Sequence, residues 1–187
     1  MEIKGRNLEF NEDTHTYYVD GEKVDSVTQI LHKVFPSKYA DIPKDVLKKA
    51  SERGTQVHKA IEAYCKGFDD GSDEVKDFKF LRKNFGFIPI ENEIPLILDL
   101  KGKTYAGTAD LIMQMNGLAL ADIKTTSVLD KEYLVYQLNL YRIGLEQSYD
   151  YKIESLYGIH LRDGKRKLVP IPMIDEDKLY EMIKEVL

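Results

Sequence analysis

The feature that most constrains this sequence is a short apolar run that ends in two opposite charges. Leu118 to Ala121 is uninterrupted, and Asp122, Ile123 and Lys124 follow it directly. Residues two apart on a strand point to the same face, so the sequence predicts that Asp122 and Lys124 lie side by side. Desolvating a carboxylate and an ammonium is costly unless each has a partner. We therefore expect this strand end to have a role beyond packing.

The spacing of an acid two residues before a lysine is not specific by itself, because it occurs eight times in the sequence. One other copy, Asp99-Leu100-Lys101, also follows an apolar run, but Gly102 and a further lysine continue it into a predicted hairpin tip. Only the copy at Asp122 is preceded within one hairpin by a second acid, Asp110, and Gly107 lies three residues before that acid. This context favours Asp122 as the functional copy.

The register of that hairpin decides whether the two acids meet. The turn signal Asn116-Gly117 is compatible with a two-residue loop, which would put Asp110 and Asp122 on opposite faces. A three-residue loop, with its glycine in the left-handed conformation, pairs Gln114 with Leu118 and sets the two acids opposite each other. We predict the three-residue loop.

Facing carboxylates repel each other as bare anions, and a hard divalent cation relieves that repulsion. Mg²⁺ takes one or two carboxylates from a protein and accepts phosphate oxygens among its other ligands. The hairpin therefore predicts metal-assisted attack on a phosphodiester.

Length and composition indicate a single domain over residues 1–187. We expect an N-terminal hairpin-and-helix extension (1–42), a core (about 43–161) and a C-terminal hairpin and helix (162–187). One cysteine, Cys65, excludes an internal disulfide and an iron–sulfur cluster. No GxxxxGK[ST] loop is present, so no ATP site is expected. The start of the sequence does not resemble a signal peptide and no apolar stretch approaches ~18 residues, so we expect a cytoplasmic protein with no membrane partner.

A long helix is expected from Pro43 to Gly67, with one apolar stripe that we expect to be buried. Close approach of another backbone would explain a glycine in that stripe. His58 flanks the stripe; alone it is more often structural than a ligand, but beside paired carboxylates it becomes a candidate metal ligand. Arg53 and Lys59 on the same helix are candidate phosphate contacts. The stripe consists of Val46, Ala50, Gly54, Val57, Ile61 and Cys65.

Two further segments supply candidate site residues. A strand is expected over Ile88 to Leu98, at a sheet edge or bulged because of its prolines, and its Glu93 is a candidate for the metal site. A helix capped by Asp130 is expected to reach about Gln147, and Gln137 needs a partner if its amide is buried. The other expected elements are strands within 8–20, helices over 27–34 and 74–85, strands over 153–161 and 166–172, and a helix from Asp175.

The motifs in order resemble a PD-(D/E)xK nuclease of the RecB-like branch. They are Gly-x-x-x-His ending at His58, Gly-x-x-Asp ending at Asp110, Asp-x-Lys over 122–124 and Gln-x-x-x-Tyr over 137–141. The likeness covers residues 53–161, and the segments 15–18 and 26–29 further resemble phage or prophage members. It implies an α/β (α+β) fold with a restriction-endonuclease-like αβββαβ core, in which helices flank a mixed central sheet.

The resemblance also implies roles for individual residues. Metal ligands would be His58, Asp110, Asp122 and the Ile123 carbonyl, with Lys124 as the catalytic lysine. Gln137 and Tyr141 would face the nucleic acid. The implied protein is a Mg²⁺- or Mn²⁺-dependent DNA nuclease, preferably an exonuclease acting on free ends in phage or bacterial DNA replication, recombination or repair. A recombination or single-strand-binding protein is a candidate partner.

Three alternatives stay open from the sequence. They are a structure-specific endonuclease, an inactive nuclease fold that binds DNA, and a small-molecule enzyme with the same metal chemistry. For the nuclease, we expect Lys124→Ala to nearly silence cleavage and to leave the fold intact.

Overall fold

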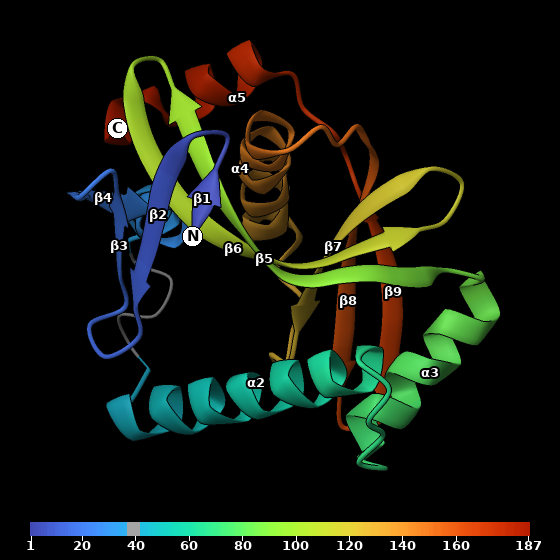
Figure 1. The fold of residues 1–187 in the computed structure, drawn as a ribbon. Coiled ribbons are helices and arrows are strands. Elements are labelled where there is room, and N and C mark those ends of the chain that lie inside the picture. Colours follow the sequence, from blue (N-terminus) through green and yellow to red (C-terminus); the bar gives the residue numbers. More distant parts are fainter. Residues whose placement is uncertain (37–41) are drawn as a thin grey trace.

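Residues 1–36 and 42–187 are described by the computed structural model, and they form a mixed β-sheet with helices on both faces (Figure 1). The strands are β1 (Glu2–Ile3), β2 (Arg6–Asn11), β3 (Thr16–Val19), β4 (Glu22–Ser26), β5 (Ile88–Leu100), β6 (Lys103–Gln114), β7 (Leu118–Lys124), β8 (Ile153–Arg162) and β9 (Lys165–Ile171). The helices are α1 (Val27–Val34), α2 (Lys44–Cys65), α3 (Asp73–Phe85), α4 (Lys131–Ser148) and α5 (Glu176–Ile183), with a final 3₁₀ turn η1 (Lys184–Val186). The predicted fold class is confirmed.

The sheet is mixed, with antiparallel and parallel strand pairs. Neighbouring strands follow β1-β2-β3-β4-β6-β7-β8-β9, and β5 pairs with β6 outside this path. The β7–β8 pair is parallel and α4 connects the two strands, whereas β5, β6 and β7 are antiparallel. A parallel connection needs a long crossover, which is the position that α4 takes. Among the described residues β5 pairs with β6 alone, and its register shifts between Pro89 and Glu91, as its prolines predict.

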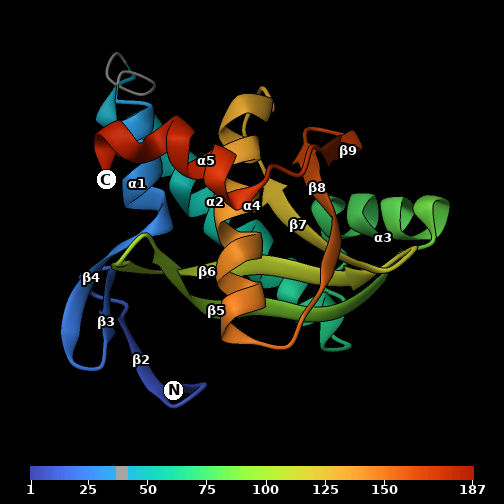
Figure 2. The same ribbon diagram turned by 90° about the horizontal axis from the view of Figure 1, so that it is seen from above.

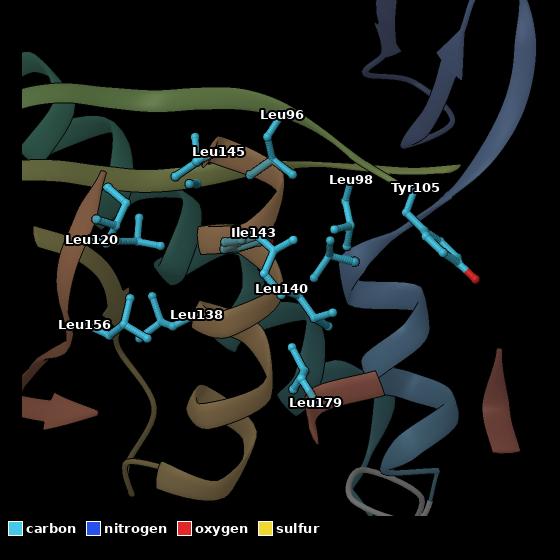
Figure 3. Close-up of a cluster of buried hydrophobic side chains, with 14 of the residues drawn as sticks. Leu96, Leu98, Tyr105, Leu120, Leu138, Leu140, Ile143, Leu145, Leu156 and Leu179 are labelled. Carbon is cyan, nitrogen blue, oxygen red and sulfur yellow. The ribbon is translucent and has the colours of Figure 1, made fainter. Parts of the chain in front are cut away.

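Alternation along β6 and β7 divides the core between the two sheet faces. Leu111 and Met113 pack with α2 and α3, while Ile112 and Leu120 pack with α4. Figure 3 shows the second cluster, where leucines of α4 meet Leu96, Leu98 and Leu120 of the sheet. Figure 2 shows α4 crossing the strands on the side away from α3. The central strands are therefore buried on both faces, so polar side chains at the strand ends lie next to an apolar core.

The hairpin between β6 and β7 has the predicted register. Gln114 pairs with Leu118 and Leu111 with Ala121, so the loop has three residues. Gly117 has a φ of +120°. Continued one step beyond the last pair, this register places Asp110 opposite Asp122.

Helix α4 approaches β5 closely because Gly144 has no side chain. A Cβ there would lie 2.6 Å from Leu96 Cδ1, 3.3 Å from Leu98 Cβ and 3.4 Å from the Ile97 carbonyl oxygen. This contact fixes the height of α4 above the sheet and so the positions of Gln137 and Tyr141.

The N-terminal strands extend the same sheet. β4 pairs in parallel with β6 through Asp25–Tyr105 and Ser26–Ala106. Ser26 then caps α1 in the predicted capping box with Gln29, and α1 packs against α4. No helix among the described residues is long and apolar enough to cross a membrane.

The apolar stripe of α2 is only partly buried, which corrects one expectation. Val57 and Ile61 are buried, but Val46 is 49% exposed and Ala50 is also exposed. Gly54 does not meet another backbone; a Cβ there would contact the Thr125 hydroxyl at 3.6 Å, an ordinary van der Waals distance. Only the C-terminal half of α2 lies over the sheet, so its N-terminal half has no core beneath it.

Candidate active site

Asp110 is held at the point where β6 and β7 stop pairing. Its Oδ2 accepts a hydrogen bond of 2.7 Å from the Ile123 backbone N–H, in place of a strand carbonyl. The other oxygen, Oδ1, lies 3.6 Å from His58 Nδ1. The carboxylate is therefore fixed by one oxygen and presents the other to α2.

His58 reaches this carboxylate from the buried side of α2. Its Nε2 donates to the Ile123 carbonyl at 3.0 Å, which leaves Nδ1 facing Asp110 and, at 3.7 Å, Glu93 Oε1. A carbonyl partner on one ring nitrogen is the usual way in which a protein orients a metal-binding histidine. The predicted ligands His58 and Asp110 are thus brought together, and the Ile123 carbonyl, also predicted as a ligand, contacts the imidazole.

Glu93 joins the group through an unusual backbone conformation. It has a φ of +51°, which is uncommon for a residue with a side chain, and it lies in β5 near the register shift. Ligand atoms of His58, Glu93 and Asp110 all lie within 4.8 Å of one another. Strained residues cluster at functional sites, and here the strain accompanies a carboxylate that faces the imidazole.

Asp122 and Lys124 form a buried ion pair beside this group. Asp122 is 2% exposed, and Lys124 Nζ lies 2.7 Å from its Oδ2. The ammonium also donates to Gln137 Oε1 at 3.0 Å and lies 5.8 Å from the centre of the Tyr133 ring. The buried amide of Gln137 therefore has the partner that its position required, and that partner is the predicted catalytic lysine.

Burial and crowding shift the pKa values of the three central groups upward. Burial, reinforced by Asp110 and opposed by Lys124, raises the pKa of Asp122 to about 6. Burial lowers the pKa of His58, but the charges of Asp110, Glu93 and Asp122 outweigh it and raise the pKa to about 9. Burial also lowers the pKa of Lys124, and Asp122 and Asp110 overcome it, so the net pKa is raised. Lys124 is therefore cationic at neutral pH.

The residues fit a hard divalent cation. Asp122 Oδ2 is buried and has no hydrogen-bond partner among the described residues, apart from the ion pair with Lys124. His58, Glu93 and Asp110 add one nitrogen and two carboxylate donors at mutual ligand distances. Oxygen donors with one imidazole suit Mg²⁺ or Mn²⁺. The site therefore offers both an excess of negative charge and the donor set for such an ion.

Gly107 connects the hairpin to the Gln-x-x-x-Tyr segment of α4. A Cβ at Gly107 would lie 2.9 Å from Tyr141 Cε1, and Tyr141 is 5% exposed. Gln137 Nε2 donates to the Tyr141 hydroxyl at 3.4 Å, and the same amide accepts from Lys124. The buried Tyr141 ring thus spaces α4 from β6 and supports the amide that holds the lysine. Both predicted nucleic-acid-facing residues are buried in this structure.

We expect Gly107→Ala to destabilise the protein by about 1–3 kcal/mol, the range for overpacking a filled core. The new methyl group must displace a buried ring that has no free space beside it. Urea unfolding measures the change. In a Tyr141→Leu background, which lacks the ring atom in question, the same Gly107→Ala change should cost less stability than it does in wild type. Equal stability of Gly107→Ala and wild type would contradict the close contact.

The two candidate phosphate contacts on α2 differ. Arg53 pairs with Glu74 at 2.7 Å and with Asp163 at 3.1 Å, so its guanidinium joins α2 to α3 and to the β8–β9 turn. Lys59 is exposed one residue beyond His58. Arg53 is therefore engaged in two ion pairs within the protein, whereas Lys59 is exposed; the phosphate-binding role of each stays a prediction.

Two residues of β8 support the site, and neither was predicted as a site residue from the sequence. His160 is 4% exposed, and its Nε2 donates to the Thr126 carbonyl at 2.7 Å. Arg162 donates to the Thr125 carbonyl at 3.1 Å. Together they fix the segment that follows Lys124. The parallel pairing of Lys124 with His160 makes this contact, and no local pattern in the sequence predicts that register.

Comparison with known proteins adds support for the fold. No protein-family model matches the sequence, and no curated protein matches it. A crystal structure from Eubacterium rectale, of a protein provisionally named an exonuclease, aligns with 87% of this chain and 77% of its own at a TM-score of 0.50 and 14% identity. The crystal structure of SSO0001 aligns with 87% of this chain and 74% of its own at a TM-score of 0.46 and 17% identity. The chain thus shares the overall fold of the Eubacterium rectale protein, consistent with a nuclease-like α+β fold.

Proposed function

We propose that this protein is a Mg²⁺- or Mn²⁺-dependent DNA nuclease of the RecB-like PD-(D/E)xK branch, acting as an exonuclease. One observation carries the proposal: His58, Glu93 and Asp110 present ligand atoms within 4.8 Å of one another, next to the Asp122–Lys124 pair. The fold shared with a protein provisionally named an exonuclease supports it.

The residues have distinct tasks in this proposal. His58, Asp110 and Asp122 would hold the ion, with Glu93 and the Ile123 carbonyl as additional donors. When bound, the ion supplies an activated water and neutralises charge that develops on the phosphate. Asp110 is held in place by the Ile123 N–H and His58 by the Ile123 carbonyl, so both side chains are positioned before substrate arrives.

Lys124 stabilises charge and does not act as a base. In the metal-free protein Asp122 and Asp110 raise its pKa and keep the ammonium protonated, and Gln137 holds it through a hydrogen bond. A fixed cation beside a phosphate is most valuable where negative charge accumulates in the transition state. Gln137 therefore acts through Lys124 as a positioning residue, with Tyr141 beneath it.

The proposal is tested with end-labelled single- and double-stranded DNA, incubated with Mg²⁺, Mn²⁺ or chelator. We expect metal-dependent release of labelled nucleotides and no product with chelator. Circular DNA and DNA with blocked ends should resist an exonuclease; cutting of circular DNA would make the protein an endonuclease. Tight DNA binding with no product under either metal would overturn the nuclease assignment.

A further inference from the structure

A groove of about 990 Å³ opens beside Lys124. One wall is the N-terminal half of α2, and the other is the segment 125–131 that follows β7. Lys124 and Thr125 belong both to this groove and to the candidate active site, so the two are continuous. A ligand in the groove can therefore contact Lys124.

Both walls of the groove carry exposed apolar side chains. Ile42, just before α2, is 38% exposed; on α2 itself Val46 is 49% exposed, and Leu47 also lines the space. On the other wall Val128 is 77% exposed, the highest value among the exposed large apolar side chains of the described residues, and Leu129 lies next to it. Exposed apolar surface gathered in one concave place is typical of a binding site.

The wall formed by residues 125–131 is held firmly. His160 and Arg162 bind the carbonyls of Thr126 and Thr125, and Thr126 Oγ1 donates to the Val128 carbonyl at 2.8 Å. Thr125 is in turn packed against Gly54 of α2. Because these bonds exist before any ligand enters, this wall is preformed and loses little conformational entropy on binding.

The lining combines an aromatic ring and apolar groups with cations at the margin. Tyr133 lines the groove with Lys124 above its ring, and the cations Lys131 and Arg162 also line it. Unpaired nucleotides match this combination, because each has an apolar face that stacks and a phosphate that pairs with cations. A duplex hides its base faces and presents phosphates instead. The volume, at the upper end of the ~300–1,000 Å³ of small-ligand sites, also suits a single strand.

We propose that this groove holds the unpaired end of a DNA strand, with its bases against Val46, Val128 and Tyr133 and the phosphate to be cut beside Lys124. This inference rests on the proposed nuclease function and names its substrate class: single-stranded or frayed ends.

Binding without cleavage tests the groove separately from catalysis. A labelled single-stranded oligonucleotide and its blunt duplex are titrated in Ca²⁺, and fluorescence anisotropy gives each Kd. We expect wild type to bind the single strand more tightly than the duplex. Val46→Asp and Val128→Asp should each weaken single-strand binding by about 10-fold or more, because a carboxylate would replace an apolar contact with a base. Both positions are exposed, so both variants should fold.

Met173→Asp provides the matched control, since Met173 is 44% exposed and does not line the groove. It should bind as wild type does. Tighter binding of duplex than of single strand by wild type, or unchanged binding by both groove variants, would overturn the inference. If those variants also cut single strands normally while Lys124→Ala does not, the nuclease function stands without the groove. If wild type binds the strand through the groove but cuts no DNA with Mg²⁺ or Mn²⁺, the function is wrong and the strand site stands.

Discussion

Lys124→Ala is expected to cut DNA about 100- to 1,000-fold more slowly than wild type, the usual cost of removing one group that stabilises transition-state charge. It is also expected to be less stable than wild type while still folding. Asp122 is 2% exposed, and Lys124 is the cation paired with it. Removing the ammonium leaves a buried carboxylate without that partner.

The loss of stability should depend on pH. Breaking a buried pair typically costs ~3–5 kcal/mol, and we expect about 2–3 kcal/mol here because Lys124 is 24% exposed and Asp122 can take up a proton. The pKa of Asp122 is about 6 with the lysine present and rises further without it. Urea unfolding of Lys124→Ala should therefore show a larger deficit at about pH 8 than at about pH 5.

A second substitution separates stability from catalysis. Lys124→Ala/Asp122→Asn has no buried charge at this position, so it should recover most of the lost stability while remaining inactive. Single-turnover rates and unfolding free energies are measured for wild type, Lys124→Ala, Asp122→Asn and the double variant, which together form a double-mutant cycle. A Lys124→Ala protein that cuts DNA at the wild-type rate would show that the active site lies elsewhere.

The hairpin was predictable because two independent constraints agree on one register. A one-residue slip would reverse the face of every side chain. Only the three-residue loop both pairs the large Leu111 and Met113 with the small Ala121 and Ala119 and sets Asp110 opposite Asp122. The structure has that loop. The pairing that matters most for the site was thus local, within one hairpin.

Other parts depended on contacts that local patterns do not encode. A helical period shows which residues share a face, but not what covers them, so the stripe of α2 was predicted to be buried along its whole length although Val46 is exposed. Glu93 was a candidate because it directly precedes the apolar section of its strand, whereas its positive φ is a tertiary feature that the sequence does not indicate. The pairing of β4 with β6, distant in sequence, and the contacts of His160 likewise had no local signal.

Mg²⁺ is expected to stabilise the protein more at about pH 9 than at about pH 6. In the metal-free protein, His58 and Asp122 both have raised pKa values, about 9 and about 6. A group with a raised folded pKa contributes stability below its unfolded pKa and loses that contribution as pH rises through its folded pKa. Asp122 thus loses its contribution between about pH 4 and 6, and His58 between about pH 6.5 and 9.

The metal reverses this trend because it replaces the lost protons. Its ligands must be an ionised carboxylate and a neutral imidazole, so proton and cation compete for the same groups, and affinity should rise toward about pH 9. At 100 times its Kd, Mg²⁺ would add about 2.7 kcal/mol to the free energy of unfolding. Thermal or urea unfolding with Mg²⁺ and with chelator, at both pH values, gives the difference.

Two variants make the measurement specific to this site. Asp110→Asn removes a predicted ligand and should abolish most of the Mg²⁺ effect at every pH. His58→Gln removes the proton that is lost between about pH 6.5 and 9, so its metal-free stability should decline less over that range than that of wild type. His15→Gln, at an exposed histidine in the β2–β3 turn, should behave as wild type does. Equal stabilisation by Mg²⁺ at both pH values would mean that Mg²⁺ binding does not displace a proton from His58. No stabilisation at either pH would show that the protein has no Mg²⁺ site here.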